Sequence, residues 1–177
     1  MLKQDNYKNT AYFQRRSIRS FVDKEVEEWK VKAILEAFFN TQTAKNQQGW
    51  EIIVINDKEL MQKIRKVHYY GRALETSPVC FIVTSVPNYN EVLKSPKRIE
   101  QDLGAATHQI CLMARDLGLG SVWCGVYPTE DIEKPIKEIL NIPEDVMVFS
   151  LVAVGYGAEE KEPNDKFFPE KVHYNGW

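Results

Sequence analysis

The strongest helical pattern of hydrophobic positions lies at residues 101–117. Apolar side chains recur there every three or four positions, as on one face of a helix: Leu103, Ala106, Ile110, Ala114 and Leu117. Ala105, Cys111, Leu112 and Met113 widen this stripe, and a helix that is apolar on most sides is normally buried. We therefore expect a buried central helix, with Gly118 at its left-handed C-terminal cap.

Four apolar runs predict strands. Residues 50–56 and 79–84 are rich in β-branched and aromatic residues, and residues 121–127 follow the central helix as a buried strand. Residues 146–156 are apolar on both faces, which is typical of a strand in the middle of a sheet.

Helical spacing accounts for most of the remaining chain. It predicts a helix capped by Asp23 that ends near Asn40, another over residues 57–69, and a third over residues 129–140 with Thr129 as its cap. Residues 6–14 have the length of a short helix, whereas residues 41–49 and 86–96 are polar loops. This mixture predicts one α+β domain over residues 1–177, with its strand order undetermined.

The segment 157–177 is polar, contains two prolines and has no clear helix or strand pattern. It nevertheless carries four large aromatic residues: Phe167, Phe168, Tyr174 and Trp177. Because a free tail would not keep them exposed to water, we expect this arm to cover a surface of its own chain or of a partner.

Composition narrows the class of protein. The chain is 44% hydrophobic and 27% charged with a net charge of −2, which argues against a general nucleic-acid or membrane-surface binder. No apolar run approaches the roughly 18 residues of a membrane helix, and the first ten residues lack the apolar core of a secretory signal. The three cysteines lie far apart in apolar segments, as expected of reduced core residues in a cytoplasmic protein.

The sequence Arg15-Arg16-Ser17-Ile18-Arg19, called the basic turn below, offers a donor set for a phosphate. A solvated basic turn before a helix explains the same residues equally well, and a nucleic-acid-binding module explains them less well. Gly125, at the end of a predicted strand, would let a flat ligand approach the backbone, although a strand bulge is the simpler explanation.

Other chemistries find no support in the sequence. The histidines and cysteines have no metal-ligand spacing. Gly118-Leu119-Gly120 follows a helix and precedes a strand, the reverse of a dinucleotide-binding loop. No GxSxG nucleophile motif is present.

Taken together and in order, three segments resemble the nitroreductase family, which binds FMN. They are RRSIRSF, TAKNQQGWEIIVI, and DLGAATHQICLMARDLGLGSVWCG followed by VAVGY. The resemblance covers essentially the whole chain. It implies an α+β fold with a mixed β-sheet flanked by helices, in an intertwined homodimer whose C-terminal arm, residues 157–177, embraces the partner.

The resemblance also implies a set of FMN-binding residues. The phosphate and ribityl chain would be held by Arg15, Arg16, Ser17 and Arg19, with Arg19 reaching the ring, and by Lys166 at the phosphate. Arg72 would lie beside the N1–O2 edge of the ring. Thr43, Ala44 and Asn46 would come from the partner subunit. One face of the ring would lie along Trp123, Cys124, Gly125 and Val126, with a backbone N–H near N5.

Two positions depart from the family pattern. Gly49 stands where a proline commonly precedes the tryptophan, which alters the loop entering the strand. Lys166 stands where many short members have an arginine, and a lysine lacks the bidentate fork for a phosphate.

The implied function is an FMN-dependent oxidoreductase that takes hydride from NADH or NADPH and passes it to a small electrophile such as a nitroaromatic or a quinone. The redox chemistry then belongs to FMN, so no catalytic side chain and no metal are needed. A specialised dehalogenase or flavin-destroying member would need an added lid, and the short segment 86–98 favours an ordinary reductase. A flavin-binding protein without turnover is the alternative outside enzymes.

Overall fold

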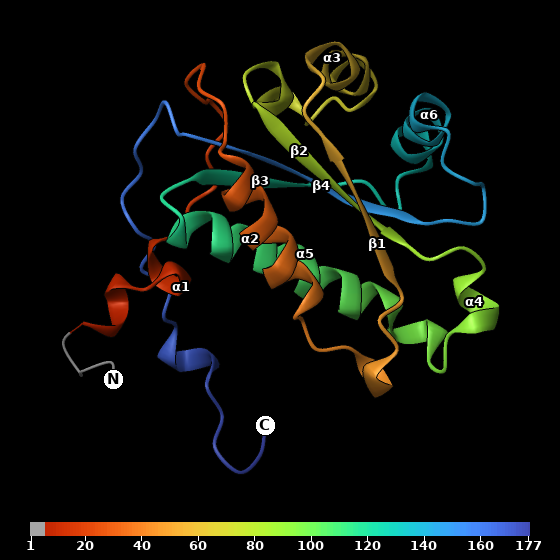
Figure 1. Cartoon of the computed structure of the whole chain (residues 1–177). Helices are drawn as coiled ribbons and strands as arrows, with labels where there is room; N and C mark the ends of the chain where they lie inside the picture. Colours follow the sequence, from red (N-terminus) through yellow and green to blue (C-terminus); the bar gives the residue numbers. More distant parts are fainter. Residues whose placement is uncertain (1–5) are drawn as a thin grey trace.

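A computed structural model describes residues 6–177 (Figure 1). The first half of residues 1–10, which were considered above for a secretory signal, lies outside the described residues. The four strands form one sheet in the order β1-β2-β4-β3, and neighbouring strands are antiparallel. Their bounds are β1, Trp50–Ile55; β2, Val79–Ser85; β3, Gly120–Gly125; and β4, Val148–Gly155. Beside β3, the chain at Ser17 forms an isolated parallel bridge with Ser121. The α+β prediction is confirmed.

Helices cover both faces of the sheet (Figure 1). On one face α5 packs with α2, and on the other α3 packs with α6, so the core has two apolar layers. The helices are α1, Ala11–Gln14; α2, Glu28–Phe39; α3, Lys58–Val67; α4, Tyr89–Val92; α5, Ile99–Asp116; and α6, Glu130–Leu140. Short 3₁₀ helices lie at Tyr7–Asn9, Ala44–Asn46 (η2), Arg72–Glu75 (η3), Pro96–Arg98 and Pro169–Lys171.

The strand β4 lies inside the sheet, as its two apolar faces predicted. All of its residues except Phe149 are buried, because the helical layers cover both of its faces. The prediction of a central strand is therefore confirmed.

The helix α5 is less enclosed than its composition indicated. It packs against the sheet and α2, but Gln101, Ala105 and His108 are exposed along its third side. The predicted stripe of Leu103, Ala106, Ile110 and Ala114 is buried, so the expectation of a buried central helix holds for that face and not for this third side.

Two boundaries also differ from the predictions. The helix assigned to an Asp23 cap begins five positions later, at Glu28, and Asp23 instead forms an ion pair with Lys58 at 3.0 Å. The loop predicted over residues 86–96 contains the single-turn helix α4, which follows Asn88. The N–H of Asn88 donates to Oδ2 of Asp145 at 2.7 Å.

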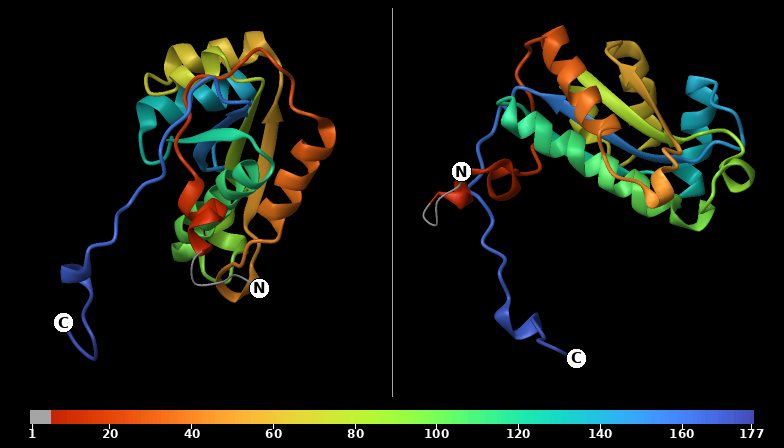
Figure 2. Two further views of the ribbon diagram at one scale, coloured as in Figure 1. Left: turned by 90° about the vertical axis from the view of Figure 1, so that its left-hand side faces the viewer. Right: turned by 60° about the horizontal axis from the view of Figure 1, so that its bottom comes forward.

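The C-terminal arm has two parts. Residues 157–162 run beside the basic turn. Residues 163–177 form an outer part that first lines a cavity with α1, at residues 163–167, and then leaves the body of the chain (Figure 2). The four aromatic residues of this outer part are between 48% and 105% exposed, so they do not cover their own chain: Phe167, Phe168, Tyr174 and Trp177. Among the described residues, no helix has the length and apolar character to cross a membrane.

Candidate functional site

The basic turn lies along the outer edge of β3. The N–H of Ile18 donates to the carbonyl of Ser121 at 3.0 Å, and Ser17 pairs with Ser121 in the parallel direction. Close approach is possible because residue 120 is glycine: a Cβ there would lie 2.9 Å from the Ile18 side chain. The parallel direction places Arg15 and Arg16 near the start of β3 and Arg19 farther along it.

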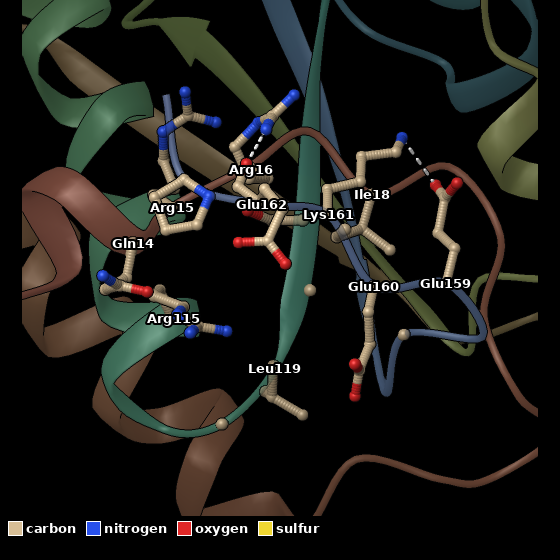
Figure 3. A pocket seen from close by; sticks show the side chains of 15 residues that line it. Gln14, Arg15, Arg16, Ile18, Arg115, Leu119, Glu159, Glu160, Lys161 and Glu162 are labelled. Atoms are coloured by element: carbon tan, nitrogen blue, oxygen red, sulfur yellow. Dashed lines mark hydrogen bonds and ion pairs between the residues drawn. The ribbon is translucent and has the colours of Figure 1, made fainter. Parts of the chain in front are cut away.

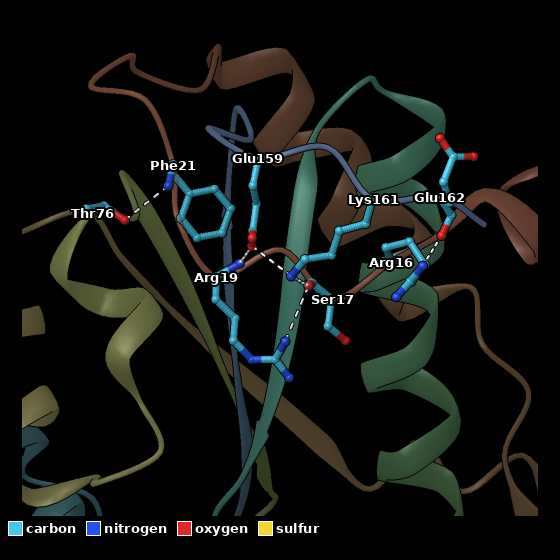
Figure 4. A network of polar contacts seen from close by, with 8 residues as sticks. All are labelled: Arg16, Ser17, Arg19, Phe21, Thr76, Glu159, Lys161 and Glu162. Carbon is cyan, nitrogen blue, oxygen red and sulfur yellow. Dashed lines mark hydrogen bonds and ion pairs between the residues drawn. The ribbon is translucent and has the colours of Figure 1, made fainter. Parts of the chain in front are cut away.

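Arg15 and Arg16 line a cavity of about 430 Å³ together with Arg115 and Lys161 (Figure 3). Within residues 6–177, no carboxylate lies at ion-pair distance from Arg115 or from the three arginines of the basic turn. Arg16 instead donates to the backbone carbonyl of Glu162 (Figure 4). Glu159, Glu160 and Glu162 line the same cavity, but none of them forms an ion pair with these arginines, so the guanidinium groups retain donors for an anionic ligand.

The arm holds the basic turn in place through Glu159 (Figure 4). Its carboxylate accepts from the backbone N–H of Arg19 at 2.7 Å and from Lys161 Nζ at 2.9 Å, and Lys161 also donates to the carbonyl of Ser17. The bond from the Arg19 backbone and then that from Lys161 hold the pKa of Glu159 below its usual range. Glu159 therefore fixes the turn through the Arg19 backbone, while the Arg19 guanidinium donates to the carbonyl of Ser17 at 3.4 Å.

The far end of β3 presents two of its four predicted residues to solvent. Trp123 is 38% exposed and Gly125 is exposed, whereas Cys124 and Val126 are buried. The thiol of Cys124 faces the carbonyl of Tyr70 at 3.7 Å, and burial raises its pKa to about 11, so it remains protonated.

Val126, the fourth residue predicted to lie along the ring, faces the core at this strand end. Its side chain is buried, its N–H donates to the carbonyl of Phe149 at 3.1 Å, and its own carbonyl accepts from the N–H of Thr129 at 2.8 Å. The strand alternates, so Cys124 and Val126 point into the core and only Trp123 and Gly125 form the outer surface.

Gly125 makes the end of β3 an open platform. No atom lies within 4 Å of the position that its Cβ would occupy. Its carbonyl contacts Nε2 of His68 at 3.0 Å, and burial lowers the pKa of this imidazole. A neutral His68 that donates through Nε2 thus holds the backbone of the strand end.

Arg72 lies in η3, within a loop that contacts both parts of the site. In this loop Thr76 Oγ1 accepts from the N–H of Phe21 at 3.1 Å, and Tyr70 faces Cys124. The Arg72 side chain is 82% exposed and its Nε lies 4.0 Å from Oε2 of Glu75.

Lys166 lies near the other end of the basic turn. Together with Arg15 it lines a second cavity, of about 870 Å³, between α1 and residues 163–167. The structure therefore places Lys166 close to the predicted phosphate-binding residues.

Thr43, Ala44 and Asn46 lie elsewhere. The N–H of Ala44 donates to Oδ1 of Asp102, in the first turn of α5. Arg115, beside Arg15 and Arg16, is 13 positions farther along the same helix (115 − 102), or about 20 Å at 1.5 Å per residue. One chain therefore does not bring the two sets of predicted residues together.

Arg115 and Lys161 were not predicted from the sequence. Arg115 belongs to the last turn of α5, three positions before the predicted cap at Gly118, so its place near a glycine-rich turn was a usable signal. Lys161 lies in a segment without helix or strand pattern, and the sequence offers no signal for its contact with Ser17.

Comparison with known proteins gives one consistent result. A model of the nitroreductase family matches residues 12–71 and 65–156. A relative from Archaeoglobus fulgidus, provisionally named NADH dehydrogenase/NAD(P)H nitroreductase, is 38% identical over 93% of this chain and 95% of its own.

Solved structures agree with the family model. A structure from Clostridium acetobutylicum, provisionally titled NADH oxidase, has a TM-score of 0.89 and 33% identity over 94% of this chain and 99% of that one. An FMN-dependent nitroreductase from Clostridium difficile R20291 has a TM-score of 0.83 and 30% identity over 93% and 96%. These matches establish that the chain belongs to the nitroreductase family.

Proposed function

We propose that the protein is an FMN-dependent oxidoreductase that passes hydride from NADH or NADPH to a small electrophile such as a nitroaromatic or a quinone. One observation carries the proposal: arginines without carboxylate partners lie along β3, which ends in an open platform at Gly125. Ser121 and Gly125 are four positions apart, about 13 Å along a strand. This edge suits an elongated ligand with a phosphate at one end and a flat ring at the other.

The residues present fit FMN. Arg15, Arg16 and Ser17 would hold the phosphate, with Arg115, Lys161 and Lys166 nearby. Trp123 and Gly125 would lie against the ring, with Arg19 and Arg72 at its edge. When bound, FMN supplies the hydride-transfer chemistry, and the protein supplies binding, orientation and charge. Positive charge from Arg19 and Arg72 would stabilise negative charge that develops at the ring edge.

The site is proposed to be completed by a second copy of the chain. Thr43, Ala44 and Asn46 lie too far along α5 to meet the basic turn of their own chain. The uncovered side of α5 and the exposed aromatic residues of the arm offer apolar surface for a partner. A homodimer in which each FMN contacts both subunits accounts for all three features.

The relatives support this proposal through their names. The similar structure from Clostridium difficile is titled an FMN-dependent nitroreductase, and the Archaeoglobus relative is named for NADH and NAD(P)H. The segment 86–98 packs on the loop of residues 43–49 through Leu93 and Ser95. Its shortness favours an ordinary reductase over a member with an added lid.

The test uses the purified protein. We expect a yellow protein with one FMN per chain, whose absorption bleaches when NADH or NADPH is added without oxygen and recovers when a nitroaromatic or a quinone follows. A colourless protein that takes up no FMN on reconstitution contradicts the proposal. Bound FMN that neither nicotinamide bleaches would indicate a flavin-binding protein without turnover.

A further inference from the structure

The loop that contains Thr43, Ala44 and Asn46 has a strained backbone. Lys45, Asn46 and Gln48 have φ angles of 53°, 51° and 47°, in the left-handed region that side chains other than glycine rarely adopt. Three such residues within four positions persist only where surrounding contacts enforce them, and such strain gathers at functional sites.

Asp102 provides the central contact. Its side chain is buried, with the residue 6% exposed. Oδ1 accepts from the N–H of Ala44 at 2.9 Å, and Oδ2 accepts from Nε2 of Gln47 at 2.7 Å. The carboxylate lies in the first turn of α5, where free N–H groups and the positive end of the helix dipole favour a negative charge.

Gln47 has a fixed orientation. Its Oε1 accepts from the N–H of Ser95 at 3.0 Å, and its Nε2 donates to the carbonyl of Ser95 at 3.3 Å as well as to Asp102. If the Gln47 amide were flipped, its NH₂ would face the N–H of Ser95 and its oxygen would face the Ser95 carbonyl and the Asp102 carboxylate. The orientation is therefore fixed, and both oxygens of Asp102 act as acceptors.

Neighbouring contacts complete the loop. Thr43 accepts from the N–H of Asn46 at 3.0 Å through its carbonyl and from the N–H of Gln48 at 3.1 Å through Oγ1. A Cβ at Gly49 would lie 2.5 Å from Leu93, so the glycine lets the segment after β2 pack directly on the loop. This explains the absence of a larger residue before Trp50.

We propose that Asp102 and Gln47 are positioning residues that hold the loop of residues 43–46 ready to contact FMN bound to the partner subunit. This inference rests on the proposed function. Asp102 touches no cofactor and acts through Asn46 and its neighbours. The same helix, α5, carries Asp102 near its start and Arg115 near its end, so one rigid element supports the loop given to the partner and the phosphate site of its own chain.

The first test is hydrogen exchange on the full chain without added FMN. Asp102→Asn must place an NH₂ group against a donor, because both oxygens of Asp102 are acceptors. We expect backbone amides of residues 43–49 to exchange about tenfold faster or more, since a hydrogen bond to a charged group is lost. Glu100→Gln removes the same charge from the same helical turn without touching the loop, and should leave this exchange unchanged. Equal exchange in wild type and Asp102→Asn overturns the proposal.

The second test measures FMN affinity by flavin fluorescence. Asp102→Asn should raise the Kd by about tenfold or more. In an Asn46→Ala background, where the positioned contact is missing, the same change should alter the Kd by less than about threefold. A purely structural role would give the same factor in both backgrounds, and that result overturns the proposal, as does an unchanged Kd for Asp102→Asn.

A second variant covers the case in which Asp102→Asn fails to fold. Gln47→Ala removes the bonds to Asp102 and Ser95 from a half-buried position and should produce the same loosening and the same dependence on Asn46. The failures can be told apart. Wild-type protein that binds no FMN overturns the proposed function and the cofactor role, whereas hydrogen exchange alone decides whether Asp102 holds the loop.

Discussion

The N–H of Ile18 donates to the carbonyl of Ser121 at 3.0 Å. Because this contact sets the basic turn parallel to β3, charged residues and an open strand end that are about a hundred positions apart in the sequence lie along one edge. The arginines of the turn thereby face the start of the strand, and Arg19 is close enough to affect the pKa of Cys124.

The first prediction concerns the arginines. Arg16→Ala or Arg19→Ala should weaken FMN binding by about 1.5–3 kcal/mol, the range for hydrogen bonds to charged groups. Flavin fluorescence titration measures this, and urea unfolding should show a stability change below about 1 kcal/mol. Lys134→Ala removes the same charge from the exposed outer side of α6 and serves as the control. An unchanged Kd in both arginine variants would favour a merely solvated turn.

The second prediction separates the two glycines of β3. In Gly120→Ala the new Cβ would lie 2.9 Å from the branched Ile18 side chain, so the turn must move and stability should fall by about 1–3 kcal/mol. In Gly125→Ala the new Cβ has no atom within 4 Å, so stability should change by less than about 1 kcal/mol.

The affinity for FMN distinguishes the two glycine variants further. Gly125→Ala should raise the Kd for FMN about tenfold or more, or about 1.4 kcal/mol, because the methyl group occupies the platform. Urea unfolding and FMN titration on each variant give the comparison. If Gly125→Ala binds FMN as the wild type does, the ring does not lie on this strand end.

The sequence predicted the core better than the boundaries. The β4 segment is apolar on both faces and lies inside the sheet, because an inner strand between two helical layers has both of its faces covered. Asp23 has the residue type of a helix cap, yet α2 begins at Glu28. Asp23 pairs with Lys58, 35 positions away, and the N–H of Val22 donates to the carbonyl of Tyr156. Such distant contacts leave no local pattern.

The same reason limits prediction of the site. The apolar run around Cys124 does not reveal that Trp123 and Gly125 face outward, because the alternation is set by pairing with β4. The left-handed conformation at Asn46 carries no glycine signal, and Asp102, which bonds to Ala44 and Gln47 of the same loop, is more than fifty positions away. The basic turn was recognisable because its charges are adjacent in the chain.

The third prediction is a pH dependence. His68 is buried, burial lowers its pKa below 6.5, and its bond to Gly125 only partly opposes this. The unfolded chain therefore binds a proton near pH 6.5 that the folded chain does not, so stability falls as the pH drops below about 6.5. This group contributes at most about 1.4 kcal/mol per pH unit.

His68→Gln removes the titration and keeps a donor for the Gly125 carbonyl. Between pH 7.5 and pH 5.5, chosen to bracket about 6.5, urea unfolding should show a shallower loss of stability than in the wild type. His108 is exposed as a residue, yet partial desolvation of its ring and then the charge of Arg15 also lower its pKa, so the difference between variants is the informative quantity. His173→Gln, at an exposed position, is the control. Parallel curves for wild type and His68→Gln would show that His68 does not carry this linkage.

The last prediction tests whether each FMN site is built from two chains. Arg19 lies on the edge of β3, whereas Asn46 lies in the loop at the start of α5. Arg19→Ala and Asn46→Ala are each expected to impair FMN binding. When the two variants are co-expressed with different affinity tags, the mixed dimer can be isolated from either parent.

If the two residues meet across the interface, one site of the mixed dimer collects both substitutions and the other collects neither. The mixed dimer should then regain one intact site, with about half the wild-type flavin content and half the rate of NAD(P)H oxidation. If both residues served the same site from one chain, every site would carry one substitution and nothing would be restored. Measurement of FMN per dimer and of the oxidation rate decides between the arrangements, and a mixed dimer no better than its parents would show that the site is not shared.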